Sequence, residues 1–427
     1  MRSTKYLARE VGLTTIAKAA TAVFAILISL TITRISGKEA FGIISLSNQL
    51  LGFFIIVIIG GHYQHIIRYI ARSRLSVHSL HQIENALRTT ISKRTLAVAP
   101  IALLVAIGVF AIQNNSIEGL IAFALMTVGL LFQVLSRINA SILLGLRKVW
   151  QSSWAENTLV NFIVCASLAA IYLGKGAITV ATIAIIYVSA RLITYVLITF
   201  YLKSTINAQV DITNTTNAEE LNSAELDTNT SFAIISLTAY AYTITSGMVL
   251  GVFGDLSGVG EYNIMLKICS PLLFVTAAIQ RSYNPRIAKA YKDKNIIYLK
   301  KSFLEFVAAA TIIFVLYATL IIFLKTEILA LWEIESHDMH NVLLILLLGH
   351  GVNIISANAG QILAMTQFEK LHARLNIVGL ILNIVLTITL VHLHGLYGAA
   401  WSFVINTTMV NGAKIWIMIK KVYPSNG

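Results

Sequence analysis

The segment TTIAKAATAVFAILISLTITRISGKEAFGIISLSNQLLGFF (residues 14–54) decides the fold class of this chain. It begins with a run of about 20 mostly apolar residues, the length that a helix needs to cross a hydrocarbon core about 30 Å thick. Arg34 and Lys38 interrupt this run, and a second apolar stretch follows them. Two spans joined by a short polar turn predict a helical membrane protein.

Stretches of the same kind fill the rest of the chain. We predict about twelve spans, at residues 14–33, 42–67, 95–113, 119–145, 153–173, 178–202, 232–253, 259–284, 302–324, 341–365, 373–393 and 396–419. The chain is 57% hydrophobic and only 12% charged, and no remaining window could bury a separate soluble core of useful size. The expected fold is therefore an all-α polytopic membrane protein.

Basic residues fall almost entirely in alternate loops. The loops before the third and ninth spans are rich in Arg and Lys, whereas the loops on the other side hold only Arg34, Lys38, Lys175 and Lys325. This asymmetry predicts a multi-pass protein of the bacterial inner membrane with both termini in the cytoplasm. Topology also accounts for most of the net charge of +13, so nucleic-acid binding is not expected. The first span is expected to be retained, because it has no small-residue cleavage site.

The expected domains are two six-helix lobes, at residues 1–203 and 231–427, joined by a cytoplasmic linker at residues 204–230. The linker is rich in Asn, Thr and Glu, a composition typical of flexible connections. Six spans return the chain to its starting side, so the lobes would be related by an axis along the membrane normal. Repeated halves of this kind are typical of transporters.

A repeated pair of residues supports two related lobes. Gly42 precedes Arg68 across one apolar span, and Gly260 precedes Arg286 across another with the same spacing. Chance agreement of a glycine and an arginine is the alternative explanation.

Three basic residues lie at bilayer depth: Arg137, Arg191 and Lys267. A charge there costs about 2.5–3.5 kcal/mol on insertion scales, so each is expected to face a cavity or a partner. Arg191, near the middle of the sixth span, is the deepest. We favour a cavity-lining role for it, with an interhelical hydrogen bond or ion pair as the alternative. The long side chains of Arg137 and Lys267 could also reach an interface.

Polar residues recur at helical spacing in several spans and favour a wet, cationic interior suited to phosphate or pyrophosphate. Ordinary helix packing in lipid also uses small and polar residues and is the alternative explanation. The candidate substrate-binding cations are Arg191, Arg137, Lys267 and Lys18. The candidate polar residues of the cavity are Gln133, Asn48, His350 and Asn353.

Acids and helix-bending residues supply the remaining candidates. Glu156, in the fifth span, is the best candidate for ion coupling, although an ion-paired or interface-seeking glutamate is the alternative. Pro271 in the eighth span and Gly52 in the second occupy corresponding depths, and a bend at both would suit rocking helices. A passive kink explains Pro271 equally well.

Enzyme activity is not expected. The chain has no Gly-rich phosphate loop followed by Lys, no His-Glu-x-x-His and no Gly-x-Ser-x-Gly. His62 and His65 lie at the opposite membrane side from His392 and His394, so these four cannot form one metal site. No cofactor and no metal are expected.

Two short motifs resemble the multidrug/oligosaccharidyl-lipid/polysaccharide (MOP) superfamily. TITRISGKEAFGIISLSNQLLGFF (residues 31–54) resembles its first two helices, with Arg34, Gly37, Phe41 and Gly42 at the motif positions. HLHGLYGAAWSFVI (residues 392–405) resembles the entry to its final helix. About twelve spans in two halves with a cytoplasmic linker are similar to Wzx-type O-antigen flippases.

This resemblance implies a V-shaped bundle that moves undecaprenyl-pyrophosphate-linked sugar units to the outer leaflet by alternating access. Arg191, Arg137 and Lys267 would then attract the pyrophosphate or acidic sugars, while Arg34 and Gly42 would be structural. The implied partners are this lipid-linked glycan, membrane lipid, and the O-antigen polymerase and chain-length machinery. A cation-coupled multidrug exporter of the same superfamily is the first alternative, and a membrane-embedded glycan-processing enzyme is the second.

Overall fold

The computed structural model divides the chain into two compact units, Met1–Leu237 and Thr238–Gly427. It describes residues 2–60, 62–72, 76–112, 117–146, 148–174, 176, 178–208, 230–253, 255–273, 287, 290–291, 293, 295–334, 336–366 and 368–422. Every regular element in these ranges is helical. The predicted all-α fold is therefore confirmed.

Unit 1 contains a series of helices that together correspond to the first six predicted spans. They are α1 (Arg2–Ile59), α2 (His62–Arg72), α3 (Val77–Ile112), α4 (Ile117–Val128), α5 (Leu130–Gly145), α6 (Val149–Ser153), the π-helix η1 (Trp154–Thr158), α7 (Leu159–Leu173) and α8 (Val180–Asn207).

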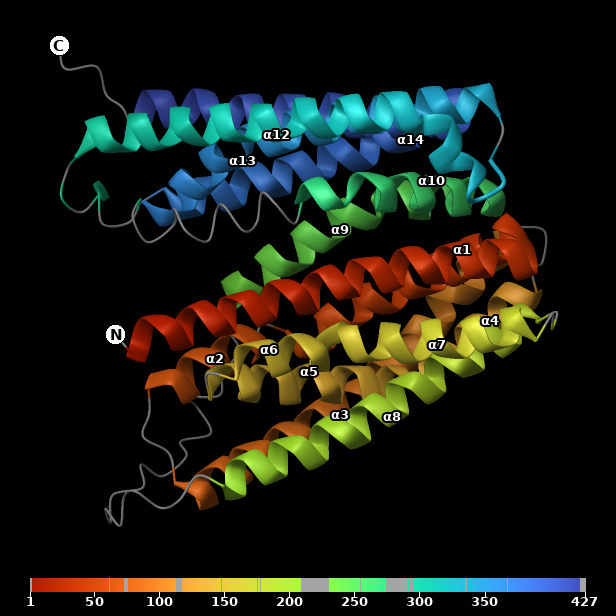
Figure 1. The fold of residues 1–427 in the computed structure, drawn as a ribbon, viewed down its shortest axis with the longest axis vertical. Coiled ribbons are helices and arrows are strands. Elements are labelled where there is room, and N and C mark those ends of the chain that lie inside the picture. The colour runs from red at the N-terminus through yellow and green to blue at the C-terminus, as the bar shows by residue number, and fades with distance from the viewer. Residues whose placement is uncertain are drawn as a thin grey trace. The chain divides into compact units, whose positions relative to one another are not determined.

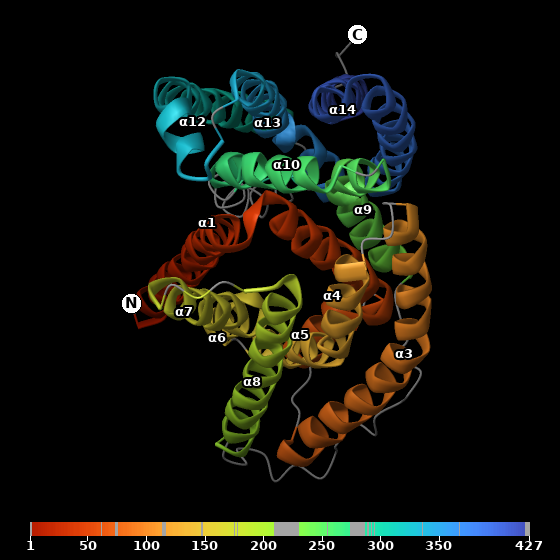
Figure 2. The ribbon, with the colours of Figure 1, turned by 90° about the vertical axis from the view of Figure 1, so that its right-hand side faces the viewer.

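The long helix α1 holds two spans. Gly37 interrupts it with φ 86° and ψ 173°, a left-handed φ that a residue without Cβ adopts at little cost. Figure 2 shows the two arms of α1 meeting at an angle. The polar turn predicted between the first two spans therefore lies at this break.

Three breaks in unit 1 were not predicted. The second span was expected to continue through residues 42–67, but α1 ends at Ile59, and Gly60 has a φ of 52° before α2 begins. The fourth span bends by 42° at Gly129, between α4 and α5. The fifth span begins with α6 and contains η1, and π-helical turns of this kind often occur at functional positions.

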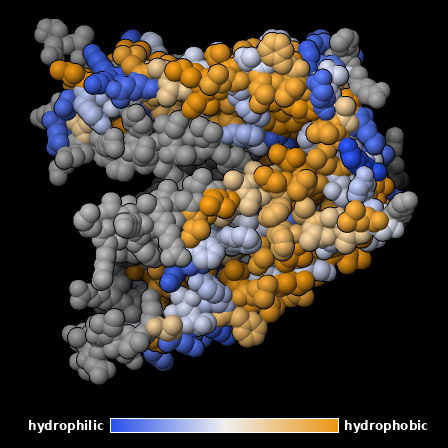
Figure 3. Space-filling view, viewed as in Figure 1, coloured by the Kyte–Doolittle hydropathy of each residue, from blue (hydrophilic) through white to orange (hydrophobic). Residues whose placement is uncertain are grey.

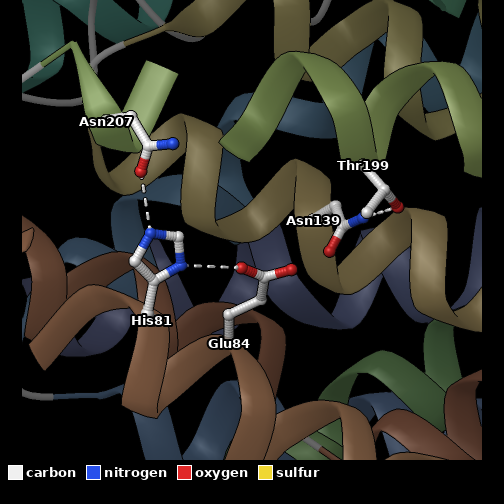
Figure 4. Close-up of polar contacts among 5 residues, drawn as sticks. All are labelled: His81, Glu84, Asn139, Thr199 and Asn207. Carbon is white, nitrogen blue, oxygen red and sulfur yellow. Dashed lines mark hydrogen bonds and ion pairs between the residues drawn. The ribbon is translucent and has the colours of Figure 1, made fainter. Parts of the chain in front are cut away.

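Polar bonds join the helices of unit 1. α1 packs against α7, α3 and α4, and α8 packs against α4 and α5 (Figure 1). Figure 4 shows His81 of α3 between Glu84 and Asn207, with its Nε2 2.9 Å from the Asn207 side-chain oxygen. In the same view the Asn139 amide donates to the Thr199 hydroxyl at 3.0 Å, which links α5 to α8.

Unit 2 is also built of helices, several of which are long. Its boundary with unit 1 falls within the first of them. They are α9 (Thr230–Val252), α10 (Leu256–Cys269), α12 (Ile296–Ala330), α13 (His337–Met365) and α14 (Glu369–Val422).

The helix α14 also holds two spans, because Gly395 interrupts it at φ 53°. Thr387 donates to the Ser402 hydroxyl at 3.0 Å, and a Cβ at Gly379 would lie 2.7 Å from Val410. Both pairs are nearly equidistant from Gly395 along the chain. The two arms of α14 are therefore antiparallel and packed side by side.

The helices have the lengths and surfaces of membrane spans. Among the described residues seven helices are long and apolar enough to cross a bilayer, and the bent pair α4–α5 would make an eighth. Since α1 and α14 each provide two spans, and α9 and α10 coincide with predicted spans, the number expected from the sequence fits these helices. Hydrophobic side chains cover the middle of the helices, and hydrophilic ones gather near their ends (Figure 3). The protein is a multi-pass membrane protein.

Some expectations cannot be followed in these helices. The residues that lie outside the described ones include 209–229 of the predicted linker, the end of the eighth predicted span at 274–284, and Arg286 of the repeated pair. The predicted limits of the two lobes stay a prediction.

Candidate functional site

A cavity of about 290 Å³ lies within unit 2, among α9, α10, α13 and both arms of α14. Ligand sites typically occupy about 300–1,000 Å³, so this cavity has the size of a small site. Because both arms of α14 line it, the reversal of the chain at Gly395 positions residues from the first arm opposite residues from the second.

Amide side chains form one part of the cavity wall. Asn353 of α13 and Asn376 and Asn411 of α14 all line it. The Asn411 Nδ2 donates to the Asn353 Oδ1 at 3.4 Å, a long bond that leaves most of the hydrogen-bonding capacity of both amides available.

A histidine and aromatic rings form the part of the wall nearest the middle of α13. His350 is only 5% exposed, and neither of its ring nitrogens has a hydrogen-bond partner among the described residues. Its ring centroid lies 4.9 Å from that of Phe403. Tyr242 and Tyr262 also line the cavity. Buried polar groups are normally bonded, so the unpartnered ring of His350 is an unusual feature of this wall.

Lys414 supplies the positive charge of the cavity. It lies on the second arm of α14, and it makes no hydrogen bond or ion pair within the part of the chain that the structure describes. His372 approaches it from the first arm: a Cβ at Gly360 would lie 3.1 Å from His372 Cε1 and 3.7 Å from Lys414 Cδ. The two basic side chains therefore converge beside Gly360.

The side chains of this wall suit an anionic or neutral polar ligand better than a cationic one. The described lining residues include a lysine, a histidine, amides, hydroxyls and aromatic rings, and none of them is Asp or Glu. Such a wall can donate hydrogen bonds to hydroxyl and phosphate oxygens and pack against a sugar ring. It offers no counter-charge to a cationic ligand.

Arg191, the deepest charge predicted in the sequence, lies inside unit 1 and is 2% exposed. Its Nη1 donates to the carbonyl of Met126 at 3.1 Å, and its Nη2 donates to the Asn48 Oδ1 at 3.0 Å. The Met126 carbonyl belongs to the last turn of α4, next to the bend at Gly129. Arg191 therefore makes interhelical hydrogen bonds, which was the alternative role considered from the sequence.

Glu156 lies on η1 and is half-buried. It accepts a short hydrogen bond from the hydroxyl of Tyr63. Thr158, on the same π-turn, lies 2.6 Å from the Thr21 hydroxyl of α1. The carboxylate of Glu156 is thus held by a neighbouring helix, and its role in ion coupling stays a prediction.

The other predicted residues are distributed over both units. In unit 1, Gln133 and Arg137 lie one turn apart on α5, each with one buried polar atom that has no partner among the described residues. Lys18 is half-buried on α1, and Lys267 is half-buried in the last turn of α10.

The two predicted hinge positions differ from each other. At Gly52 the helix α1 continues without a break, whereas Pro271 follows the end of α10 at Cys269. Only the position at Pro271 therefore coincides with an interrupted helix.

Of the predicted cavity residues, His350 and Asn353 line the unit 2 cavity, and Asn48 and Arg191 bond to each other in unit 1. Lys414, Asn376 and Asn411 were not predicted. Lys414 lies within the last predicted span, and its depth relative to Lys420 and Lys421 was the available signal. Within the described residues, no cluster of three His, Cys, Asp or Glu side chains could hold a metal.

No protein-family model and no curated protein matches the chain. Solved structures do. A multidrug resistance transporter of the MATE family in an inward-facing conformation matches with a TM-score of 0.74 and 17% identity, over 95% of this chain and 96% of that one. The MATE multidrug transporter DinF-BH matches with a TM-score of 0.67 and 15% identity, over 98% and 95% of the two chains.

A MOP superfamily transporter from Pyrococcus furiosus matches with a TM-score of 0.61 and 17% identity, over 97% of this chain and 95% of that one. These proteins are transporters rather than enzymes. At such identities the likeness concerns the fold, which agrees with the motifs at residues 31–54 and 392–405. The chain has the fold of the MATE transporters of the MOP superfamily.

Proposed function

We propose that this protein is a transporter that moves undecaprenyl-pyrophosphate-linked oligosaccharides, of the O-antigen type, from the inner to the outer leaflet. The observation that carries the proposal is the set of side chains that line the unit 2 cavity. Its described wall combines hydrogen-bond donors, aromatic rings and Lys414, and it contains no carboxylate. A sugar phosphate presents hydroxyl groups, apolar ring faces and negative charge, and each has a counterpart there.

The size of the cavity limits what it would hold. With about 290 Å³ it would accept a sugar ring or a phosphorylated end rather than a whole repeat unit. The lipid tail would remain in the bilayer, because moving an apolar chain into a polar cavity is unfavourable.

A cation-coupled multidrug exporter is the second candidate. Two of the similar structures are multidrug transporters, which favours this candidate more than a flippase. Glu156, held by Tyr63 on the π-turn of unit 1, is a carboxylate that could bind a coupling ion. The Pyrococcus furiosus transporter is described as having a binding pocket of reverse polarity that suggests a different function. Pocket polarity is therefore a sound criterion for separating the two candidates.

Genetic complementation tests the proposal. The gene is expressed in a bacterium that lacks its own flippase and makes a matched sugar unit, and surface polysaccharide is measured with protein level checked by blot. Restored long-chain polysaccharide is the expected result. Absence of polysaccharide despite normal protein level, together with raised resistance to cationic dyes, would favour the exporter. The polymerase and chain-length proteins of the host are then the proposed partners, and the inner membrane the proposed location.

A further inference from the structure

We propose that Lys414, which lines the unit 2 cavity, and His372, which lies beside it but is not one of the lining residues, form a phosphate-binding subsite at one end of the cavity. This inference rests on the proposed function and deepens it, because it assigns the ends of the cavity to different parts of the substrate. The phosphate would bind at Lys414, and the adjoining sugar would bind toward His350 and Phe403.

The first argument is the space beside Gly360. A methyl group at this position would lie 3.1 Å from His372 Cε1, closer than side chains normally approach, and 3.7 Å from Lys414 Cδ. The glycine on α13 therefore provides the room in which side chains from the two arms of α14 converge. Two basic residues that meet at one point repel each other when both are charged, unless an anion lies between them.

The second argument is the unused hydrogen-bonding capacity at this point. The Asn376 Nδ2 lies 3.4 Å from the His372 Nε2, which leaves the other ring nitrogen, Nδ1, for a second contact. That Nδ1 is buried and has no partner among the described residues. The three ammonium donors of Lys414 likewise make no bond there. A half-buried ammonium without a partner matches the oxygen atoms of a phosphate group, and a protonated Nδ1 beside it would donate a second bond.

The third argument is the order of groups along the cavity. Phe403 and Lys414 are separated by about 16 Å along the second arm of α14, at 1.5 Å per residue. Lys414 lies about 9 Å from Lys420, near the end of the helix that the basic loops predict to be cytoplasmic. Asn353 and Asn411 lie between the lysine and the His350–Phe403 pair. A substrate entering from the cytoplasmic leaflet would therefore keep its phosphate nearest to that leaflet.

Two sources could supply a phosphate ester to this subsite: a lipid-linked sugar pyrophosphate and an ordinary phospholipid head group. Binding of radiolabelled pyrophosphate to the purified full-length protein tests the site, and competition by undecaprenyl pyrophosphate or by phosphatidylglycerol distinguishes the sources. The variants are Lys414→Gln and His372→Gln. Lys420→Gln is the matched control, since this lysine lies on the same helix, with its ammonium 4.1 Å from the Trp416 ring centroid.

Loss of a charge-assisted bond weakens binding by roughly tenfold or more. We expect this loss for Lys414→Gln, a smaller loss for His372→Gln, and no change for Lys420→Gln. Gly360→Ala should weaken binding several-fold without removing a polar group, which guards against misfolding of a polar variant. Equal affinity in Lys414→Gln and wild type would overturn the proposal.

The competition separates the two ligands. Displacement by undecaprenyl pyrophosphate alone supports the substrate as the ligand, and equal displacement by phosphatidylglycerol supports a phosphate site for membrane lipid. Restored polysaccharide with unchanged pyrophosphate binding in Lys414→Gln would leave the flippase standing and remove the subsite. Lysine-dependent binding without complementation would leave the subsite standing and remove the flippase.

Discussion

Arg191 in unit 1 is buried and Lys414 in unit 2 is half-buried, and these two basic residues differ in whether neighbouring groups bond to them. In unit 1, two nitrogens of Arg191 donate to Met126 and Asn48, and the side chain closes the bend between α4 and α5. In unit 2, Lys414 has no bonding partner among the described residues and lines a cavity. The guanidinium of Arg191 is thus largely occupied by bonds within the protein, whereas the ammonium of Lys414 is left for a ligand. The following changes test that difference.

Removing the Arg191 side chain, which is bonded through two of its three nitrogens, should have the largest effect. Arg191→Ala removes two hydrogen bonds to a charged group, each worth about 1.5–3 kcal/mol, and leaves a void next to Gly129. We expect a lower thermal midpoint and much less protein in the membrane fraction, with part of the stability kept in Arg191→Lys. Arg88→Ala is the control, because Arg88 is exposed and lies 5.5 Å from the Tyr195 ring centroid. A stable Arg191→Ala protein that fails to export would instead make Arg191 a ligand-binding residue.

Removing the Tyr63 hydroxyl, which donates to Glu156, should have a smaller effect. Tyr63→Phe removes one bond to a half-buried carboxylate, and we expect a loss of about 1.5 kcal/mol in the free energy of unfolding. Thermal unfolding of the purified variant in detergent measures this loss. An unchanged midpoint would mean that the contact between α2 and η1 is not part of what stabilises unit 1.

In unit 2, by contrast, removing a buried polar side chain should make the protein more stable rather than less. His350→Leu removes a buried group whose two nitrogens have no partner among the described residues, so we expect the protein to become more stable by about 1 kcal/mol. The same variant should bind the lipid-linked sugar more weakly. Destabilisation with unchanged binding would indicate that His350 is a structural residue and would weaken the contrast between the units.

The smallest effect is expected for Glu156→Gln. The amide oxygen can still accept from Tyr63, so stability should hardly change. Under the flippase proposal export should stay within about twofold of wild type, because no step requires the negative charge. Loss of transport at normal protein level would identify Glu156 as a coupling site and favour the cation-coupled exporter.

Hydropathy located the spans because each must be long and apolar enough to cross the bilayer. The turns predicted at residues 34–41 and 394–395 contain Gly37 and Gly395, where the structure has its breaks. The break at Gly60 was missed, because the predicted span was extended past the polar residues at 62–65 to Ile66 and Ile67, and a left-handed φ leaves no trace in hydropathy.

The site was harder to predict than the fold. The depth of Arg191 follows from the sequence, which gave an interhelical bond as the alternative role, but its partners Met126 and Asn48 are distant in the chain and could not be identified. His350 and Asn353 were found by their helical spacing, and both line the cavity. Lys414 was not selected from the sequence, since only the packing of the two antiparallel arms of α14 shows that it lines a cavity.

The most direct test measures ligand-induced stabilisation in three proteins: wild type, Arg191→Lys and Lys414→Gln. Each is unfolded thermally with and without undecaprenyl pyrophosphate. A ligand at a hundred times its Kd stabilises the folded state by about 2.7 kcal/mol. We predict that the ligand raises the midpoint of wild type and of Arg191→Lys and does not raise that of Lys414→Gln. A normal shift in Lys414→Gln with none in Arg191→Lys would contradict the account and move the binding site to unit 1.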